Sequence, residues 1–153
     1  MMTLKDVVDK YHKVVLYMTT IGLLAYGLMT IFVPEVLAAG FERFVDQDWV
    51  QFQSGNDVIA SYIVLLWRLI GIFNLMAGIV LSLMVWKWMK QGNRWSWIAI
   101  FVGTILAYLG PMITDLTVGS IEIFEIIEFS LFAIFVIVML IVRNLYFSRV
   151  EAG

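Results

Sequence analysis

The stretch LIGIFNLMAGIVLSLMVW at Leu69–Trp86 decides the fold, because none of its 18 residues carries a charge. As an α-helix it is about 27 Å long, close to the roughly 30 Å of a bilayer's hydrocarbon core. Two further charge-free windows, Val14–Pro34 and Trp95–Thr114, have a similar length. A fourth, Phe129–Val142, reaches spanning length when it begins near Ile121 and takes in three Glu. No window alternates apolar and polar residues with period two, so the pattern predicts helices and not barrel strands.

The composition of the 153-residue chain excludes most soluble and catalytic classes. Hydrophobic residues make up 62% and charged residues 14% of the chain, against roughly 45–50% and about 25% in a typical globular protein. The chain has no Cys and one His, which excludes disulfide frameworks, thiol catalysis and His clusters for metal or haem. No phosphate loop, nucleophile–base pair or nucleic-acid motif is present. We therefore expect a protein of the lipid bilayer that is not an enzyme, with no cofactor, no metal site and no nucleic-acid partner.

The predicted fold class is all-α, a single-domain integral membrane four-helix bundle. Its spans are predicted at residues ~13–34, ~58–87, ~95–113 and ~121–143. Eight of the ten Lys and Arg fall at one level of this bundle, namely Lys5, Lys10, Lys13, Lys87, Lys90, Arg94, Arg143 and Arg149. The positive-inside rule then predicts a multi-pass protein of the cell membrane with both termini in the cytoplasm. We interpret Trp86, Trp88, Trp95 and Trp97 as an interfacial belt at that level, and His12 as a solvated surface residue.

The segment Pro34–Asp57 joins the first two spans and is mainly acidic. On a helical wheel its apolar residues gather on one side, namely Leu37, Phe41, Phe44, Val45, Trp49 and Phe52. Three acidic residues lie opposite, namely Glu35, Glu42 and Asp46. This pattern predicts a short amphipathic helix in the first extracytoplasmic loop, on the membrane surface or over the mouth of the bundle. A loose acidic loop is the alternative.

Small and polar residues recur at helical spacing in three of the spans, and such residues mediate helix packing in membranes. In the second span they are Arg68, Gly71, Asn74, Gly78 and Ser82. In the third span they are Ser96, Ala99, Gly103, Ala107 and Gly110. The first span offers Thr19, Gly22, Tyr26 and Thr30. We expect these faces to form the bundle interior, and Pro111 to kink or end the third helix.

Ionisable residues inside the predicted spans are the candidate site, because charged groups there are costly and commonly functional or paired. Counted from the basic residues at 1.5 Å per residue, four of them reach one layer in the outer third of the bilayer. These four are Arg68, Asp115, Glu125 and Glu128. Glu122 precedes Glu125 and Glu128 at the same spacing of three, so the three acids face one side. With Asn74 in the second span, they form the predicted ligand- or ion-binding set.

A purely structural interpretation of this set stays open. Arg68 is able to form an ion pair that fixes the helix register, or to extend outward beside Trp67. Glu122 suits the first turn of a helix, where the dipole favours a carboxylate. Asn74 suits a hydrogen bond between helices. A polar cavity between Arg68 and the acids would favour a site, and a close pair without a cavity would favour the structural role.

The chain resembles the DoxX-like small four-helix membrane proteins over about residues 60–140. The resemblance rests on Arg68-Leu69-Ile70-Gly71 with Gly78, on Leu109-Gly110, on Asp115 and Gly119, and on a Glu such as Glu125 or Glu128. Pro111 stands where such proteins often carry a basic residue. The resemblance implies a four-helix bundle and little about chemistry.

Three functions agree with this sequence. The first is a non-catalytic protein whose outer-facing polar pocket binds a small molecule, a cation or a lipid headgroup. The second is an accessory subunit of a membrane complex, or a homo-oligomer, with no ligand site. The third is a small transporter coupled to protons or cations, although no charge marks the inner half of any span.

Overall fold

The computed structural model describes residues 4–91, 94–119 and 123–147. Within these ranges the chain is helical nearly throughout and forms no strand. The elements in chain order are α1 (Leu4–Phe32), the short 3-10 helix η1 (Pro34–Leu37), α2 (Ala38–Val45), α3 (Trp49–Gly55), α4 (Asp57–Gln91), α5 (Arg94–Val118) and α6 (Ile123–Phe147). The prediction of an all-α chain is confirmed.

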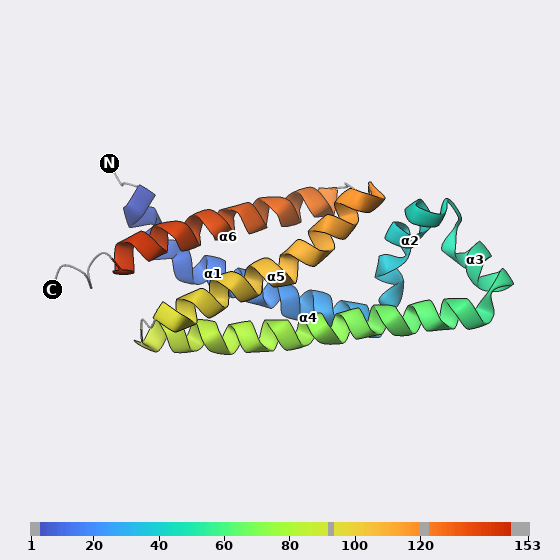
Figure 1. The fold of residues 1–153 in the computed structure, drawn as a ribbon, viewed down its shortest axis with the longest axis horizontal. Helices are drawn as coiled ribbons and strands as arrows, with labels where there is room; N and C mark the ends of the chain where they lie inside the picture. The colour runs from blue at the N-terminus through green and yellow to red at the C-terminus, as the bar shows by residue number, and fades with distance from the viewer. Residues whose placement is uncertain (1–3, 92–93, 120–122, 148–153) are drawn as a thin grey trace.

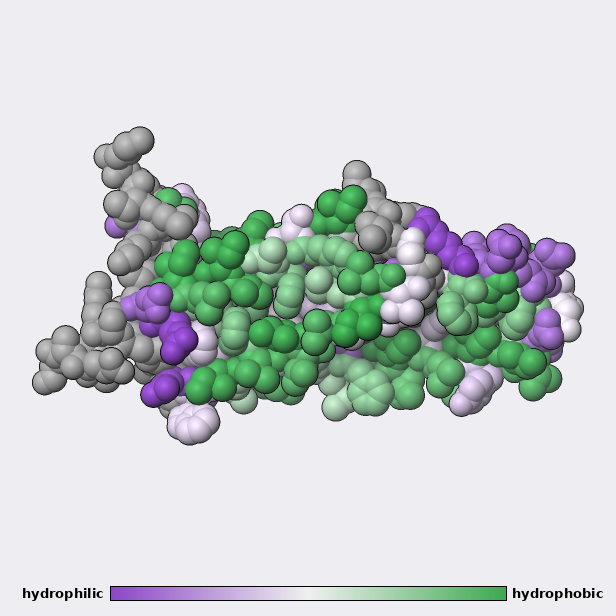
Figure 2. Space-filling model, turned by 45° about the horizontal axis from the view of Figure 1, so that its top comes forward, coloured by the Kyte–Doolittle hydropathy of each residue, from purple (hydrophilic) through white to green (hydrophobic). Residues whose placement is uncertain are grey.

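Among the described residues, four helices are long and apolar enough to cross a membrane: α1, α4, α5 and α6. They are four candidate spans at the places where the sequence predicts them, and they indicate a multi-pass helical membrane protein. Hydrophobic side chains cover the middle of the face shown in Figure 2, while hydrophilic side chains gather toward its two ends. This banded surface is what a helix bundle needs when acyl chains surround its middle and water its ends.

The four long helices run antiparallel to their neighbours. α1 packs against α4 and α6, and α5 packs against the same two helices, so the four form a ring. α1 begins, α6 ends and α4 passes to α5 at one end of the molecule, here called the basic end because Lys and Arg gather there (Figure 1). The other end carries α2 and α3. α3 and η1 contact α4, whereas α2 contacts η1, α3 and α5. α4 has 35 residues, or about 52 Å, so it extends well past the hydrocarbon core and supports α3 and η1.

Glycines bring α1 and α4 together, and this is the most extensive helix contact of the chain. A Cβ added at Gly27 would lie 2.6 Å from the Leu75 backbone nitrogen, and one at Gly71 would lie 2.9 Å from the Gly27 carbonyl oxygen. Gly78 lies equally close to Leu24. Such close backbone approach replaces the hydrophobic effect, which cannot drive helices together in lipid. The predicted packing roles of Gly71 and Gly78 are confirmed, while Gly27 is an addition.

The packing face of α4 differs from the prediction at its outer end. Its buried residues are Ala60, Trp67, Gly71, Asn74, Gly78, Leu81, Val85 and Trp88. This set recurs at steps of three and four in a seven-residue repeat, which places Trp67 in the stripe. Arg68 is exposed, so its expected place on the packing face is wrong. A step of three residues back from Gly71 leads to Arg68, which the sequence pattern predicts on the packing face. In the structure the step is four residues, to Trp67.

The basic half of the bundle holds the main hydrophobic core, here called the basic-end core. Its buried members are Leu16, Val85, Trp88, Trp97, Ile100, Phe135, Val138, Met139 and Val142. The Trp97 indole nitrogen donates to the Met139 carbonyl oxygen at 3.2 Å, which ties α5 to α6. The interfacial belt is therefore half right, because Trp86 and Trp95 are exposed while Trp88 and Trp97 are buried.

His12 is a second correction at the basic end. It is 2% exposed and packs edge-on against the Trp88 ring, with 5.7 Å between ring centroids. The expected solvated position is wrong, because α1 turns this side of the helix toward α4. The neighbouring Lys residues suggested that His12 is in contact with solvent, but adjacent residues of a helix lie on different faces.

The predicted amphipathic helix between the first two spans consists of two helices, α2 and α3. Asp46 ends α2 in a left-handed conformation with φ 55°, and Asp48 caps α3 by accepting from the Gln51 backbone nitrogen at 3.1 Å. The Glu42 carboxylate accepts from the Trp49 backbone nitrogen at 2.9 Å and so links the two helices. The apolar side chains form the outer aromatic cluster, which consists of Phe41, Trp49, Phe52 and Trp67. This segment is an ordered cover on α4 and not a loose loop.

We predict that Gly27→Ala destabilises the bundle, because the added methyl group meets the rigid backbone of α4. The expected loss is about 1–3 kcal/mol in the free energy of unfolding, as for other overpacked sites. The measurement is the thermal midpoint of helix loss in detergent micelles, followed by circular dichroism. Gly110→Ala is the control, because nothing lies within 4 Å of its added Cβ. Equal midpoints for the two variants would contradict close packing at Gly27.

Candidate functional site

A cavity of about 210 Å³ lies inside the bundle, and all four long helices line it. We call it the central cavity. Its lining residues are Gly22, Leu23, Tyr26, Asn74, Ala107, Tyr108, Pro111, Ile127, Glu128 and Leu131. The polar groups among them come from each helix in turn: Tyr26 from α1, Asn74 from α4, Tyr108 from α5 and Glu128 from α6.

Helix rise places these polar groups at one depth. Asn74 lies 13 residues from Lys87 and Tyr108 lies 14 from Arg94, or about 20 Å and 21 Å from the basic end. Glu128 lies 15 residues from Arg143, or about 22 Å. Three helices thus give nearly the same level, about two thirds of the way across a roughly 30 Å core. The cavity is a polar layer inside an apolar zone.

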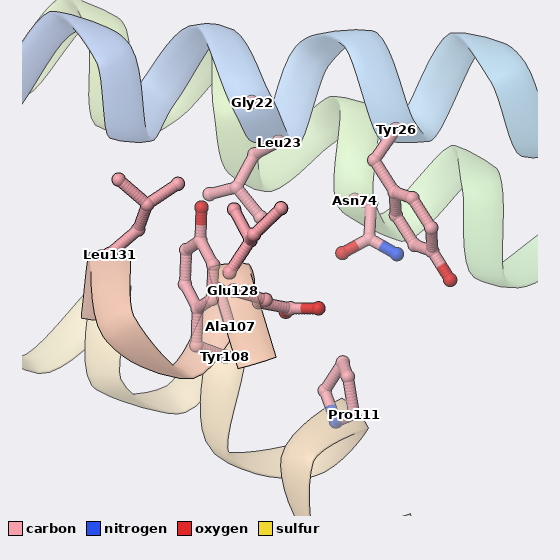
Figure 3. Close-up of a pocket in the computed structure, with 10 residues that line it drawn as sticks. Gly22, Leu23, Tyr26, Asn74, Ala107, Tyr108, Pro111, Glu128 and Leu131 are labelled. Atoms are coloured by element: carbon pink, nitrogen blue, oxygen red, sulfur yellow. The ribbon is translucent and has the colours of Figure 1, made fainter. Parts of the chain in front are cut away.

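Figure 3 shows how the polar side chains are arranged around the space. The Glu128 carboxylate extends from α6 toward the region framed by Asn74, Tyr26 and Pro111. Asn74 reaches in from α4 and the Tyr26 ring from α1. A carboxylate of α6 is therefore presented to polar groups of other helices.

Two features make the central cavity rich in acceptor oxygens. The Asn74 side-chain nitrogen donates to the Ile70 carbonyl of its own helix at 3.1 Å, and the amide oxygen is the acceptor that this side chain adds to the cavity lining. Pro111 has no N–H to donate to the carbonyl of Ala107, four residues earlier on α5. Ala107 itself lines the cavity. Pro111 was expected to kink or end the third helix. It does not end α5, which continues to Val118, and its ring removes one hydrogen bond within the helix.

Tyr108 is held firmly beside the carboxylate. Its hydroxyl donates to the Thr19 carbonyl oxygen of α1 at 3.3 Å, and its ring stacks on Phe132 with 5.8 Å between centroids. A Cβ added at Gly22 would make an ordinary van der Waals contact with this hydroxyl, at 3.5 Å. The phenol therefore bridges α5 to α1 across the bundle and fixes one wall of the cavity.

A second cavity of about 460 Å³ adjoins the first on the side of α2. We call it the distal cavity. Its lining residues are Tyr26, Leu37, Gly40, Phe41, Phe44, Trp67, Ile70, Pro111, Thr114 and Asp115. Tyr26 and Pro111 line both cavities, so these two residues form the boundary between them. The distal cavity is mainly aromatic and aliphatic, with Asp115 as its one described acidic residue.

The structure separates the predicted site residues into groups. Asn74 and Glu128 meet in the central cavity, and Asp115 lines the distal one. Arg68 is exposed and lines neither. Glu122 lies outside the described residues, and of Glu125 only the backbone is described.

Sequence reasoning missed several residues that shape the two cavities. Tyr108 was not considered, although a phenol in the middle of a span has to find a polar partner. Pro111 was interpreted only as a helix breaker, while its spacing of four from Ala107 also indicates an unfilled carbonyl. Phe41 was placed in the loop helix and Trp67 was named only as a neighbour of Arg68, because nothing in the sequence says that these two rings meet.

The charges of the site favour positive ligands. Of the described residues that line the two cavities, two are carboxylates and none is Lys or Arg. Among the described residues, no group of three or more His, Cys, Asp or Glu could hold a metal ion. One carboxylate with neutral oxygens and aromatic rings suits a singly charged cation better than a multivalent metal.

Comparison with known protein families, curated proteins and solved structures gives no match to this chain. The resemblance to DoxX-like proteins therefore stays a prediction. The function has to be argued from the cavities themselves.

We predict that Thr104→Val leaves the fold intact and raises its stability. Thr104 is 1% exposed, and its hydroxyl has no hydrogen-bond partner in the part of the chain that the structure describes. Removing an unsatisfied buried hydroxyl is expected to stabilise the protein by about 1 kcal/mol. The measurement is again the thermal midpoint in micelles.

Thr30→Val is the matched control for this prediction. Thr30 is equally buried, but its hydroxyl donates to the Tyr26 carbonyl oxygen at 2.8 Å. Its replacement is expected to cost about 0.5–1.5 kcal/mol. A loss of stability in Thr104→Val as large as in Thr30→Val would show that the Thr104 hydroxyl is satisfied.

Proposed function

We propose that this chain is a non-catalytic multi-pass protein of the cell membrane that binds a small organic cation in the central cavity. The observation that carries the proposal is the position of Glu128, which lines a cavity between four apolar helices together with neutral oxygens of the other three. A carboxylate at this depth gains most from a positive partner, since water is scarce there. Both termini are proposed to lie in the cytoplasm, as the distribution of Lys and Arg predicts.

A cation fits this cavity better than the other ligand classes that the sequence allowed. An anionic molecule or lipid phosphate would need Arg68 inside the bundle, but Arg68 is exposed. The Tyr26 and Tyr108 rings border the same space as Glu128. Aromatic faces attract cations, and proteins commonly use them to bind quaternary ammonium groups.

Binding is also a better proposal than transport. A transporter gives its site access from both sides of the membrane, whereas the basic-end core fills the bundle below the central cavity with buried side chains. An accessory subunit without a ligand site has no need of a carboxylate facing a cavity. The packed core and the lined cavity together favour a binding protein whose site opens away from the basic end.

We predict that tetramethylammonium stabilises the purified protein and that Glu128→Gln abolishes this effect. The substitution keeps the side-chain shape and removes the charge. Loss of a charged partner typically costs about 1.5–3 kcal/mol, so binding is expected to weaken more than tenfold. The measurement is the thermal midpoint in micelles as tetramethylammonium chloride replaces sodium chloride at constant ionic strength.

Glu35→Gln is the control for this experiment, because Glu35 is an exposed carboxylate that lines neither cavity. It is expected to keep the full shift of the unmodified protein. The proposal fails when tetramethylammonium does not move the midpoint of the unmodified protein, or when Glu128→Gln shows the same shift.

The orientation is tested by single cysteines, since the chain has no Cys of its own. Ser54 on α3 and Asn144 near the end of α6 are both exposed and lie at opposite ends of the bundle. We expect a membrane-impermeant maleimide to label Ser54→Cys in intact cells, and Asn144→Cys only after the cells are permeabilised. The reverse pattern would place the termini outside.

A further inference from the structure

We infer that the central and distal cavities form one elongated site for an amphipathic organic cation, with its ammonium head beside Glu128 and its aromatic or apolar body in the distal cavity. This inference rests on the proposed function and extends it from a small cation to a class of ligand. It gives the distal cavity a role in holding the body of the ligand, whereas a small cation would occupy the central cavity alone.

The continuity of the two cavities is the first argument. Tyr26 of α1 and Pro111 of α5 line both spaces, so a molecule that passes between these two side chains contacts both cavities. The central cavity is the smaller, at about 210 Å³, and the distal one measures about 460 Å³. Their combined size falls within the range of roughly 300–1,000 Å³ that drug-sized ligands occupy. A small cation would fill only the central part.

The lining of the distal cavity is the second argument. Three aromatic side chains, Phe41, Phe44 and Trp67, border it together with aliphatic residues. Such a surface holds an apolar body, and ring faces also attract the positive charge next to it. Phe44 is 74% exposed, so part of this aromatic wall is open to an incoming molecule.

The cover of the distal cavity is the third argument, because it is built as a fixed wall. Phe41 of α2 packs edge-on against Trp49 and Phe52, with centroid distances of 5.0 Å and 4.8 Å. The Arg43 guanidinium donates to the Gly119 carbonyl oxygen at the end of α5, at 3.5 Å. α2 is thus attached both to α3 and to α5, and it holds its apolar face toward the cavity.

Depth determines the orientation of the ligand. Asp115 lies 21 residues from Arg94, or about 31 Å, at the edge of the hydrocarbon core. Glu128 lies about 9 Å deeper by the same helix rise, where a positive partner is needed more. The ammonium head therefore pairs with Glu128, and the reverse orientation would depend on Asp115.

The test compares two probes that share a quaternary ammonium head, tetramethylammonium and benzyltrimethylammonium, by calorimetric titration of the intact protein in detergent. Phenylmethanesulfonate serves as the anionic counterpart, and titration into empty micelles corrects for partitioning. We expect the benzyl compound to bind roughly tenfold more tightly, because its ring reaches the aromatic wall. No binding of the sulfonate is expected.

Gly40 allows the distal cavity to be filled without disturbing the central one. It lines the distal cavity, and nothing lies within 4 Å of a Cβ added there. Gly40→Leu is expected to remove the tenfold advantage of the benzyl compound and to leave tetramethylammonium unaffected, with Gly40→Ala as the control. Glu128→Gln is expected to weaken both ammonium probes more than Asp115→Asn does, and Glu35→Gln, outside both cavities, is the control that leaves them unchanged.

Each outcome of the test is informative. Tetramethylammonium binding without a gain from the benzyl group, or a gain that survives Gly40→Leu, overturns the elongated site while the proposed function stands. A greater loss in Asp115→Asn than in Glu128→Gln overturns the orientation. Failure of both ammonium probes to bind overturns the proposed function itself, and binding of the sulfonate overturns the preference for cations.

Discussion

The close approach of α1 and α4 at Gly27 and Gly71 is the constraint on which the rest of this structure depends. In lipid no hydrophobic effect pulls helices together, so association depends on backbone contact and polar groups. An added Cβ at either glycine would lie within 2.9 Å of the facing backbone, which leaves little freedom in register or distance. Once this pair is fixed, α5 and α6 close the ring by contact with both sides of it.

The cavities lie where the bundle is less completely filled than at its basic end. At the basic end, large residues such as Trp88 and Trp97 pack in the main hydrophobic core. Farther out, Tyr26 and Asn74 line the central cavity at the level of the glycine contact, and Pro111 deprives α5 of one hydrogen bond. Tyr26 and Pro111 also border the distal cavity, so these two residues connect the packing of the helices with both spaces.

The sequence predicts this fold well where a feature depends only on neighbouring residues, as the length and apolarity of a span do. Uncharged windows predict four spans because length and apolarity act locally, and Gly71 and Gly78 are found by spacing alone. Arg68 shows the limit of this reasoning. The stripe can be extended outward from Gly71 by three residues, to Arg68, or by four, to Trp67, and these two side chains point in directions about 100° apart. The predictions for His12, Trp88 and Trp97 are wrong for the same reason. The composition at a membrane boundary does not say which side chains point into the bundle. The meeting of Asn74 with Glu128 depends on four helices at once.

The position of Glu128 makes more sense as a site than as a stabilising element. A charged residue within the hydrocarbon core is costly, by about 2.5–3.5 kcal/mol for Asp, Lys or Arg at a helix centre, and an apolar side chain in place of Glu128 would fill the cavity and improve packing. The protein instead keeps a carboxylate, a carboxamide and a phenol around a space of about 210 Å³. The Tyr108 hydroxyl donates to Thr19 of α1 and the Asn74 amide donates to its own helix, so both side chains are held in place around the cavity. A cation in this space would meet the Glu128 carboxylate together with the rings of Tyr26 and Tyr108, and this combination of charge and aromatic faces is what the site offers a ligand.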